Sequence, residues 1–199
     1  MRAFNDLIAA LRKLPTIGPK TARRMALHLL QQDRQGAIEL NQALSAALAE
    51  LNPCAQCRQL SAQTLCDICI DAQRDQSLVC VVSTLDDLIR IEQSDVFQGR
   101  YFVLNGLLSP IDGVGPEQLG LPNLLQQIEQ GVISELVLAI GTQVEGEATA
   151  HFIIDHLPRA VMVSRLAQGV PLGQDLSRLD AATLGMALAA RNRSELGPA

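Results

Sequence analysis

Pro53-Cys54-Ala55-Gln56-Cys57 and Leu65-Cys66-Asp67-Ile68-Cys69 place two Cys-x-x-Cys pairs in one short region of a 199-residue chain. Eight residues separate the pairs, which is enough for a small loop that brings them together. Each pair turns two sulfurs toward one point, and two pairs supply the four thiolates of a tetrahedral metal site. Zinc suits four thiolates because it is borderline-soft, redox-silent and has no d-electron preference for a geometry other than tetrahedral. We therefore predict one structural zinc ion held by Cys54, Cys57, Cys66 and Cys69.

Three other chemistries fit the same cysteine spacing: two disulfides, a redox dithiol, or an iron–sulfur centre. The start of the chain, Met1-Arg2-Ala3-Phe4-Asn5-Asp6, does not resemble a secretory signal, and no apolar run approaches the roughly 18–20 residues needed to cross a bilayer. We therefore expect a cytoplasmic protein without a membrane segment, in which a disulfide framework is disfavoured. Because protein would fill all four ligand positions, the metal is expected to hold structure and to do no chemistry.

The formal net charge of −5 is unevenly distributed along the chain. Residues 1–34 carry +5 and the remainder carries −10. The basic residues of that first segment are Arg2, Arg12, Lys13, Lys20, Arg23, Arg24 and Arg34. Such a segment can meet a polyanion, whereas the acidic remainder would face a protein or a metal. The distribution therefore favours nucleic-acid binding through the N-terminal segment, although the acidic total alone argues against it.

Leu14-Pro15-Thr16-Ile17-Gly18-Pro19-Lys20 joins two predicted amphipathic helices. The first is expected over residues 3–13, because its apolar residues recur at helical spacing and Pro15 cannot continue it. Gly18 permits a tight turn, and Pro19 can open the second helix because its missing N–H costs nothing there. This pattern resembles the helix-hairpin-helix element of DNA-binding proteins, in which hairpin amides and a helix N-terminus meet a phosphate.

Lys20, Arg23 and Arg24 lie in the first turns of that second helix and would add charge along a DNA backbone. Contacts of this kind carry no base information, so the predicted binding is sequence-independent and sensitive to salt. The alternative is an ordinary helical hairpin with a solvated basic face. Thr16 stands where such hairpins usually have their first glycine, which keeps this alternative open.

Residues 36–51 are predicted to form a third helix that leads into the cysteines. Its apolar residues are expected to form a buried stripe made of Ile38, Leu40, Leu44, Leu48 and Leu51. A helical module of this size has too little apolar surface to hold itself together. We therefore expect the zinc ion to clamp it.

After residue 76 the apolar pattern changes to short runs that alternate with helical segments. Continuous apolar runs of this length are typical of strands that are buried on both faces. The predicted strands are 78–82, 101–104, 136–140 and 160–163, and the predicted helices between them are 84–93, 119–130 and 145–157. This alternation predicts a mostly parallel sheet with helices on its faces. Cys80 lies within the first strand and is predicted to be a core thiol rather than a fifth metal ligand.

Two polar loops follow predicted strand ends, where sheets of this kind place their sites. The first spans residues 105–116 and contains Asp112; the second spans 141–147 and contains Glu145 and Glu147. Together the three carboxylates could supply oxygen ligands to Mg²⁺. The competing explanation is that Glu145 and Glu147 complement the N-terminus of the following helix, and spacing alone favours it.

The order of these parts resembles that of one family. A basic helix-hairpin-helix, a four-cysteine module and an acidic α/β domain with Val-Glu-Gly-Glu-Ala-Thr at 144–149 are similar to the bacterial recombination mediators of the RecR family. The stretches 14–20, 108–116 and 169–173 also match stretches of that family. The resemblance covers essentially the whole chain.

The resemblance implies an α+β multi-domain protein that mediates recombination. Its expected parts are a helix-hairpin-helix DNA-binding domain at 1–52, a four-cysteine zinc finger at 53–76, a Toprim domain at 77–172, and a C-terminal turn and helix for oligomer contact at 173–199. It further implies a protein that acts with RecO and RecF to load recombinase onto gapped DNA. Members of the family form homodimers and ring-like homotetramers, and a ring would set several basic segments around one duplex.

The chain departs from the family pattern at positions that matter for catalysis. A catalytic Toprim domain needs a Glu at the end of its first strand, where this chain has Ser83, and a Glu expected near the C-terminal turn is Ser177. The usual Asn-Pro is replaced around 141–142, and the only Tyr, Tyr101, lies within a predicted strand. Ser cannot replace a carboxylate as a metal ligand or proton carrier near neutral pH.

These departures argue against strand cleavage and place any Mg²⁺ requirement in doubt. We therefore predict a non-enzymatic protein, with a Toprim-type Mg²⁺-dependent nuclease as the alternative. Glu145 and Glu147 are then candidates for docking a partner such as RecO.

Overall fold

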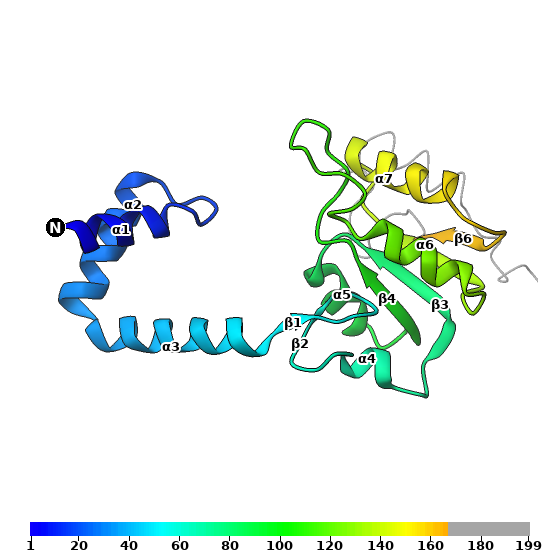
Figure 1. Cartoon of the computed structure of the whole chain (residues 1–199), viewed down its shortest axis with the longest axis horizontal. Helices are drawn as coiled ribbons and strands as arrows, with labels where there is room; N and C mark the ends of the chain where they lie inside the picture. Colours follow the sequence, from blue (N-terminus) through cyan, green and yellow to red (C-terminus); the bar gives the residue numbers. More distant parts are fainter. Residues whose placement is uncertain (167–199) are drawn as a thin grey trace, which may run out of the picture. The chain divides into compact units, whose positions relative to one another are not determined.

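The computed structural model of the chain describes residues 1–166, and Figure 1 shows its elements. The chain divides into two compact units. The first comprises Met1–Pro53 with Leu60–Thr64, and the second comprises Cys54–Gln59 with the chain from Leu65 onward. All four paired cysteines therefore belong to the second unit.

The first unit begins with a helical hairpin. Helix α1 spans Arg2–Leu11 and packs against helix α2, which spans Pro19–Leu27. Gly18 is the N-cap of α2 and Pro19 occupies its first turn, as the sequence predicts. The buried residues of α2 are Ala22 and Ala26, whose small side chains let the two helices approach closely. The predicted helix-hairpin-helix arrangement is confirmed.

The turn between α1 and α2 has the geometry of a type II β-turn. The Ile17 N–H donates to the Leu14 carbonyl oxygen at 3.3 Å, with Pro15 at the second position and Thr16 at the third. Thr16 has φ 66°, in the left-handed region. Pro suits the second position of this turn, but the third normally takes Gly because a Cβ is strained there. The turn therefore forms with a residue type that its geometry disfavours.

A π-helical turn, η1 (His28–Gln32), connects α2 to helix α3 (Arg34–Glu50). Asp33 caps α3 by accepting a hydrogen bond from the Gly36 N–H at 2.8 Å. The limits of α3 agree with the predicted third helix to within two residues.

The predicted burial of the apolar stripe on α3 is wrong. All five of its side chains are exposed, from 39% for Leu51 to 75% for Leu48. Leu40, Leu44 and Leu48 are spaced four apart and share one face, whereas Ile38 lies about 200° away from Leu40 around the helix. The periodicity is real, but in the part of the chain that the structure describes the stripe is a surface rather than a core.

The second unit is built on a four-stranded sheet with the order β4-β3-β5-β6. Every strand pair is parallel, as the alternating pattern predicts. The strands are β3 (Asp75–Val82), β4 (Gly99–Val103), β5 (Glu135–Ala139) and β6 (Met162–Arg165), and the intervening helices are α5 (Leu85–Glu92), α6 (Leu121–Glu129) and α7 (Val144–Asp155). Each limit falls within three residues of its prediction.

Helices α6 and α7 cover one face of this sheet and α5 covers the other (Figure 1). On the first face, Leu124 and Ile128 of α6 and Ile153 of α7 pack against strand side chains. On the second face, Leu88 of α5 packs in a cluster with Cys80. Cys80 is 1% exposed, and burial raises the pKa of its thiol to about 12. Its prediction as a core thiol is confirmed.

Short elements flank the cysteine pairs. Strands β1 (Asn52–Pro53) and β2 (Leu60–Ser61) pair antiparallel on either side of the first Cys-x-x-Cys. Helix α4 (Asp67–Ile70) carries the end of the second pair. Within the described residues, no helix has both the length and the apolar character needed to span a bilayer. The C-terminal turn and helix predicted at 173–199, and Ser177 with them, lie outside the described residues.

Candidate metal centre and basic surface

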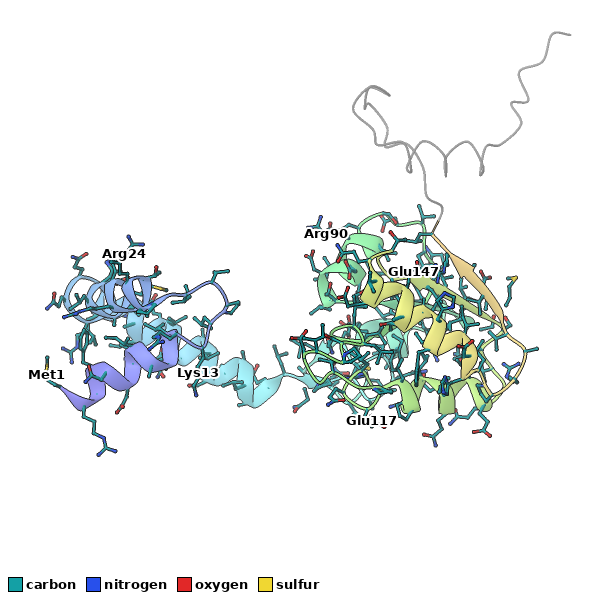
Figure 2. All side chains as sticks on the ribbon, turned by 90° about the horizontal axis from the view of Figure 1, so that it is seen from above. Met1, Lys13, Arg24, Arg90, Glu117 and Glu147 are labelled. Atoms are coloured by element: carbon teal, nitrogen blue, oxygen red, sulfur yellow. The ribbon has the colours of Figure 1, made fainter. Side chains whose placement is uncertain are left out.

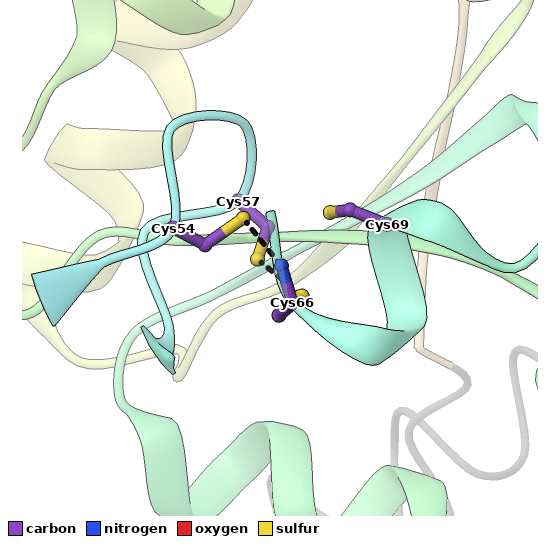
Figure 3. A group of neighbouring side chains, drawn as sticks. All are labelled: Cys54, Cys57, Cys66 and Cys69. Atoms are coloured by element: carbon purple, nitrogen blue, oxygen red, sulfur yellow. Dashed lines mark hydrogen bonds between the residues drawn. The ribbon is translucent and has the colours of Figure 1, made fainter. Parts of the chain in front are cut away.

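The four paired cysteines converge on one point (Figure 3). Their sulfur atoms all lie within 4.8 Å of one another, and all four side chains are buried. The Cys57 and Cys66 sulfurs are 3.4 Å apart, and the Cys66 N–H donates to the Cys54 sulfur at 3.3 Å. The convergence predicted from the spacing of the two pairs is confirmed.

The sulfur spacing fits a tetrahedral metal ion. With metal–sulfur bonds of about 2.3 Å, neighbouring thiolates of a tetrahedral site stand about 3.8 Å apart. That spacing lies inside the 4.8 Å within which these four sulfurs are found. All four are free thiols, so the structure contains none of the disulfides that the cysteine spacing also allowed. Across residues 1–166, this is the one group of three or more His, Cys, Asp or Glu that could hold a metal.

The surroundings shift the pKa values of Cys54, Cys57 and Cys66 in different directions. Burial opposes ionisation of Cys54, but the backbone N–H groups of Cys57, Cys66 and Gln56 outweigh it and lower the pKa of Cys54 to about 6. The neighbouring Cys69 thiol and burial both raise the pKa of Cys57. Burial is also the main cause that raises the pKa of Cys66, to about 11. Because adjacent buried thiolates repel one another, all four can ionise together only around a cation.

The turn that carries Cys54 and Cys57, residues 54–59, is a knuckle fastened to the sheet. The Val103 N–H of edge strand β4 donates to the Cys57 carbonyl oxygen at 2.8 Å. The Gln127 side chain of α6 donates to the Gln56 carbonyl oxygen at 3.0 Å. The four-cysteine centre is therefore integral to the α/β unit and covers one edge of its sheet.

The predicted DNA-binding side chains form a basic surface on α2. Lys20, Arg23 and Arg24 are exposed, and Figure 2 shows Arg24 on the outer side of the helix. Across residues 1–166, no carboxylate lies within ion-pairing distance of these three cations. In the second unit, by contrast, Arg90 and Arg165 each pair with a carboxylate. The α2 cations are therefore free to meet an external anion.

The three carboxylates considered for Mg²⁺ are not brought together. Asp112 accepts a hydrogen bond from the Ser109 hydroxyl at 2.7 Å within the loop after β4. Both oxygens of Glu147 accept from Arg165, at 2.8 and 2.9 Å, and Glu145 is exposed on the first turn of α7. No metal cluster of acidic groups forms in the described chain. Both glutamates lie in the first turn of α7, where acidic residues complement the helix N-terminus.

Comparison with known proteins identifies the family. Residues 4–48 match the model described as RecR, helix-hairpin-helix, and residues 77–167 match the Toprim domain model. The chain is 52% identical over 189 residues to the Recombination protein RecR of Stutzerimonas stutzeri strain A1501, with 94% of each chain covered. The proteins of the same name from Alcanivorax borkumensis and Acinetobacter baylyi are 50% and 48% identical over 188 residues, covering 94% and 93% of this chain and 94% of each relative. The chain belongs to the RecR family.

In this RecR family member, the strand-end position of the Toprim sheet is occupied by Ser83. It directly follows β3, and its carbonyl oxygen accepts a hydrogen bond from the Gly106 N–H at 3.0 Å. Tyr101 lies inside β4, is 2% exposed, and donates its hydroxyl proton to Glu92 at 2.6 Å. Burial and that hydrogen bond both raise the pKa of Tyr101. The buried and hydrogen-bonded Tyr101 is therefore not placed to act as a nucleophile, and Ser83 lacks the carboxylate that would carry a proton at this position.

Two arginines of this family member have roles that the sequence did not reveal. Arg74 donates two hydrogen bonds to Glu92, at 2.9 and 2.6 Å, and Arg58 donates to the Gln118 carbonyl oxygen at 2.8 Å. Their partners lie 18 and 60 residues away along the chain. No local pattern marks such long-range pairs, so only the folded chain shows them.

Proposed function

We propose that this RecR family member is a non-enzymatic, sequence-nonspecific DNA-binding protein that mediates recombinational repair. The proposal includes the action with RecO and RecF that the family resemblance implies, in which recombinase is loaded onto gapped DNA. The observation that carries the DNA-binding part is the group of three exposed, unpaired cations on α2 within the described chain: Lys20, Arg23 and Arg24. All three fall within the residues that match the RecR helix-hairpin-helix model.

The start of α2 supports phosphate binding for a second reason. Gly18 provides no side-chain cap, and Pro19 has no N–H, so the next backbone N–H groups of the first turn lack a side-chain acceptor. A helix N-terminus with free N–H groups favours an anion, and the adjacent cations increase that preference. These contacts address the sugar-phosphate backbone and carry no base information.

A salt titration of duplex binding tests the proposal. The variant Lys20→Gln/Arg24→Gln is compared with Arg90→Gln/Arg165→Gln, which removes the same charge from the second unit. The α2 variant is expected to bind more weakly and to lower the slope of log affinity against log salt by about 0.9 for each phosphate that it no longer neutralises. The control is expected to keep the parental slope, because its arginines are held by carboxylates. Equal slopes for the parent and the α2 variant would refute the assignment.

We further propose Zn²⁺ as the ion at Cys54, Cys57, Cys66 and Cys69. Four clustered, buried thiols are a donor set that zinc prefers, and protein fills the whole coordination shell. Bound zinc would neutralise the thiolates and cross-link the two cysteine pairs. The surrounding residues hold the site against β4 and α6, which supports a structural role.

The proposed partners use other surfaces. We propose that Glu145, which is exposed at the start of α7, contributes to docking a partner such as RecO, with Glu147 beside it on the same turn. The ion pair between Glu147 and Arg165 makes Glu145 the freer of the two. We also propose self-association through the exposed apolar face of α3, which supports the homodimer or ring-like homotetramer expected of the family.

No observation favours the nuclease alternative. Ser83 follows the first strand of the Toprim sheet, and the acidic groups nearby do not gather into a metal-binding cluster in the described chain. Plasmid nicking with Mg²⁺ or Mn²⁺ is the measurement that distinguishes the two functions, and nicking at a rate above background would overturn the non-enzymatic proposal.

The functional division into 1–52, 53–76, 77–172 and 173–199 also stands as a proposal.

A further inference from the structure

Arg58 is the residue directly after Cys57 and joins the knuckle to a distant loop. Its N–H donates to the Cys54 carbonyl oxygen at 2.9 Å, so its backbone helps to close the knuckle. Its backbone has φ 67°, a left-handed conformation that is uncommon for a residue with a Cβ. This strained conformation aims a long cationic side chain away from the cysteines, toward the chain around residue 118.

The Arg58 guanidinium is held between an aromatic ring and a backbone carbonyl. It lies over the Phe102 ring at 5.9 Å from the ring centroid, and its Nη2 donates to the Gln118 carbonyl oxygen at 2.8 Å. Its Nη1 is buried without a hydrogen-bond partner in the described chain. Gly120 closes the space around it: a Cβ at Gly120 would lie 2.1 Å from Nη1, and Gly120 itself has φ 69°. The loop is therefore shaped around this one side chain.

The loop that Arg58 reaches, residues 105–120, is also anchored near its two ends. The Gly106 N–H donates to the Ser83 carbonyl oxygen at 3.0 Å, the Leu108 N–H donates to the Thr149 hydroxyl oxygen at 2.9 Å, and Leu119 is buried in the core. Its projecting part is closed on itself by the bridge between Ser109 and Val114. The Gln118 side chain accepts from the Gly115 N–H at 2.9 Å and donates to the Gly113 carbonyl oxygen at 3.3 Å. These bonds are internal to the loop and do not fix it to the sheet. Arg58 bonds to Gln118, the residue through which the loop holds its own shape.

We propose that Arg58 is a positioning residue that makes the order of the 105–120 loop depend on occupancy of the four-cysteine centre. The inference rests on the proposed metal site. A metal ion bound to Cys54 and Cys57 fixes the knuckle, the knuckle fixes the backbone of Arg58, and Arg58 fixes Gln118. Without the metal, no bond links Cys54 to Cys57 through the ion, so the knuckle loosens and the loop loses its anchor at Gln118, while the bonds internal to the loop remain. By linkage, a loop held by Arg58 in turn favours metal binding.

The test compares zinc-loaded Arg58→Met with the parent and with Arg90→Met. Met keeps the apolar stem of arginine but donates no hydrogen bond, and Arg90 is an exposed α5 residue far from this contact in sequence. Hydrogen exchange is followed at loop amides that are bonded within the segment: Val114, Leu119 and Gly120. Removal of the charged hydrogen bond is expected to speed their exchange about tenfold, with Val81 of the central strand unchanged as the measure of global folding.

A second measurement tests the same coupling in the opposite direction, from the loop contact to metal binding. Zinc affinity is measured by competition with a chromophoric chelator on folded protein, and Arg58→Met is expected to bind about tenfold more weakly, by reciprocity with the loop effect. Arg90→Met is expected to match the parent. Unchanged loop exchange or unchanged zinc affinity in Arg58→Met overturns the coupling. If the parent itself binds no stoichiometric zinc, the proposed metal centre falls and this inference falls with it, a result that is distinct from the first.

Discussion

Thr16 adopts a left-handed backbone conformation at the hairpin position where glycine is the ordinary choice. A Cβ in that region costs about 1–2 kcal/mol, and branching at Cβ makes Thr a poor occupant. Thr16→Gly is expected to raise the free energy of unfolding of the helical unit by about 0.5–1 kcal/mol, after the extra chain entropy of glycine is allowed for. Thr21→Gly makes the same chemical change inside α2 and is expected to destabilise. Thermal unfolding measures both, and a destabilised Thr16→Gly would contradict the strain argument.

Glu92 illustrates how a single carboxylate can join two elements. Arg74 donates to both of its oxygens and Tyr101 donates a third hydrogen bond. Burial opposes ionisation of Glu92, but Arg74 and Tyr101 outweigh it and lower its pKa. Glu92→Gln is expected to reduce the free energy of unfolding by about 1–3 kcal/mol, because it leaves the partly buried Arg74 with only Asp71, at 3.8 Å, as a charge partner.

The lowered pKa of Glu92 also determines how the stability difference between the parent and Glu92→Gln changes with pH. A carboxylate with a lowered folded-state pKa stabilises the fold fully above its ordinary pKa of about 4.3, and loses that contribution as pH falls through the folded-state value. The gap between parent and Glu92→Gln is therefore expected to be constant near neutral pH and to shrink below about pH 4. Urea unfolding at a series of pH values measures it, with Asp86→Asn on exposed α5 as the control. A gap that widens in acid would contradict the assignment.

Residue spacing predicted the cysteine cluster because two Cys-x-x-Cys pairs have few ways to fold other than toward each other. It could not predict Arg58 or Arg74, because their side chains reach partners far away in sequence and no periodic pattern encodes such reach. Asp112 does not join a metal-binding cluster in the described chain, for a related reason. Its loop folds back on itself through Ser109, so the strand-end position alone did not bring it to the α7 glutamates.

Among the elements, the knuckle and α4 are expected to depend on the proposed metal ion more than the sheet and the other helices do. The two cysteine segments contribute few apolar side chains to the sheet clusters and are held by isolated hydrogen bonds such as those from Val103 and Gln127. The limits of the four sheet strands and of the helices between them were predictable, because continuous apolar strands alternate with amphipathic helices. The short elements η1, β1, β2 and α4 were not predicted. What periodicity could not supply was the attachment of the knuckle to β4, which makes the metal centre a part of the α/β unit.

Cys66→Ala tests that dependence. It removes one ligand and is expected to abolish stoichiometric zinc binding and to destabilise the second unit by several kcal/mol, because metal binding free energy contributes directly to folding. Cys80→Ala removes a buried thiol that is not a ligand and should cost only about 1–2 kcal/mol, through the small cavity left behind. Metal content and thermal unfolding are measured together. Parental stability in metal-free Cys66→Ala would contradict a structural role for the ion.

Across the whole molecule, the basic N-terminal segment and the acidic remainder differ in charge and in how many side chains they bury. The segment with net charge +5 carries the exposed cations of α2, and the sheet lies in the acidic remainder. In Met1–Pro53 the only fully buried side chains are Ala22 and Ala26, and the apolar face of α3 is left open. A helical unit with so small a core gains little from folding alone, so burial of the α3 face by a second copy would supply apolar surface that one chain lacks.

Leu44→Lys/Leu48→Lys tests this assembly at the face where the apolar residues are spaced four apart. The introduced charges cannot be buried without a partner, so the variant is expected to shift toward monomer and to lose stability in its helical unit. Gln42→Lys/Ala46→Lys adds the same charge on the opposite side of α3 and is expected to assemble as the parent does. Light scattering at micromolar concentration measures the mass, and DNA titration measures the consequence. Because several basic segments joined in one assembly bind with higher avidity than one, the monomeric variant should bind duplex DNA more weakly although Lys20, Arg23 and Arg24 are intact. If the Leu44→Lys/Leu48→Lys variant keeps the parental mass, the α3 face is not the contact between copies, and its exposure must serve a different partner.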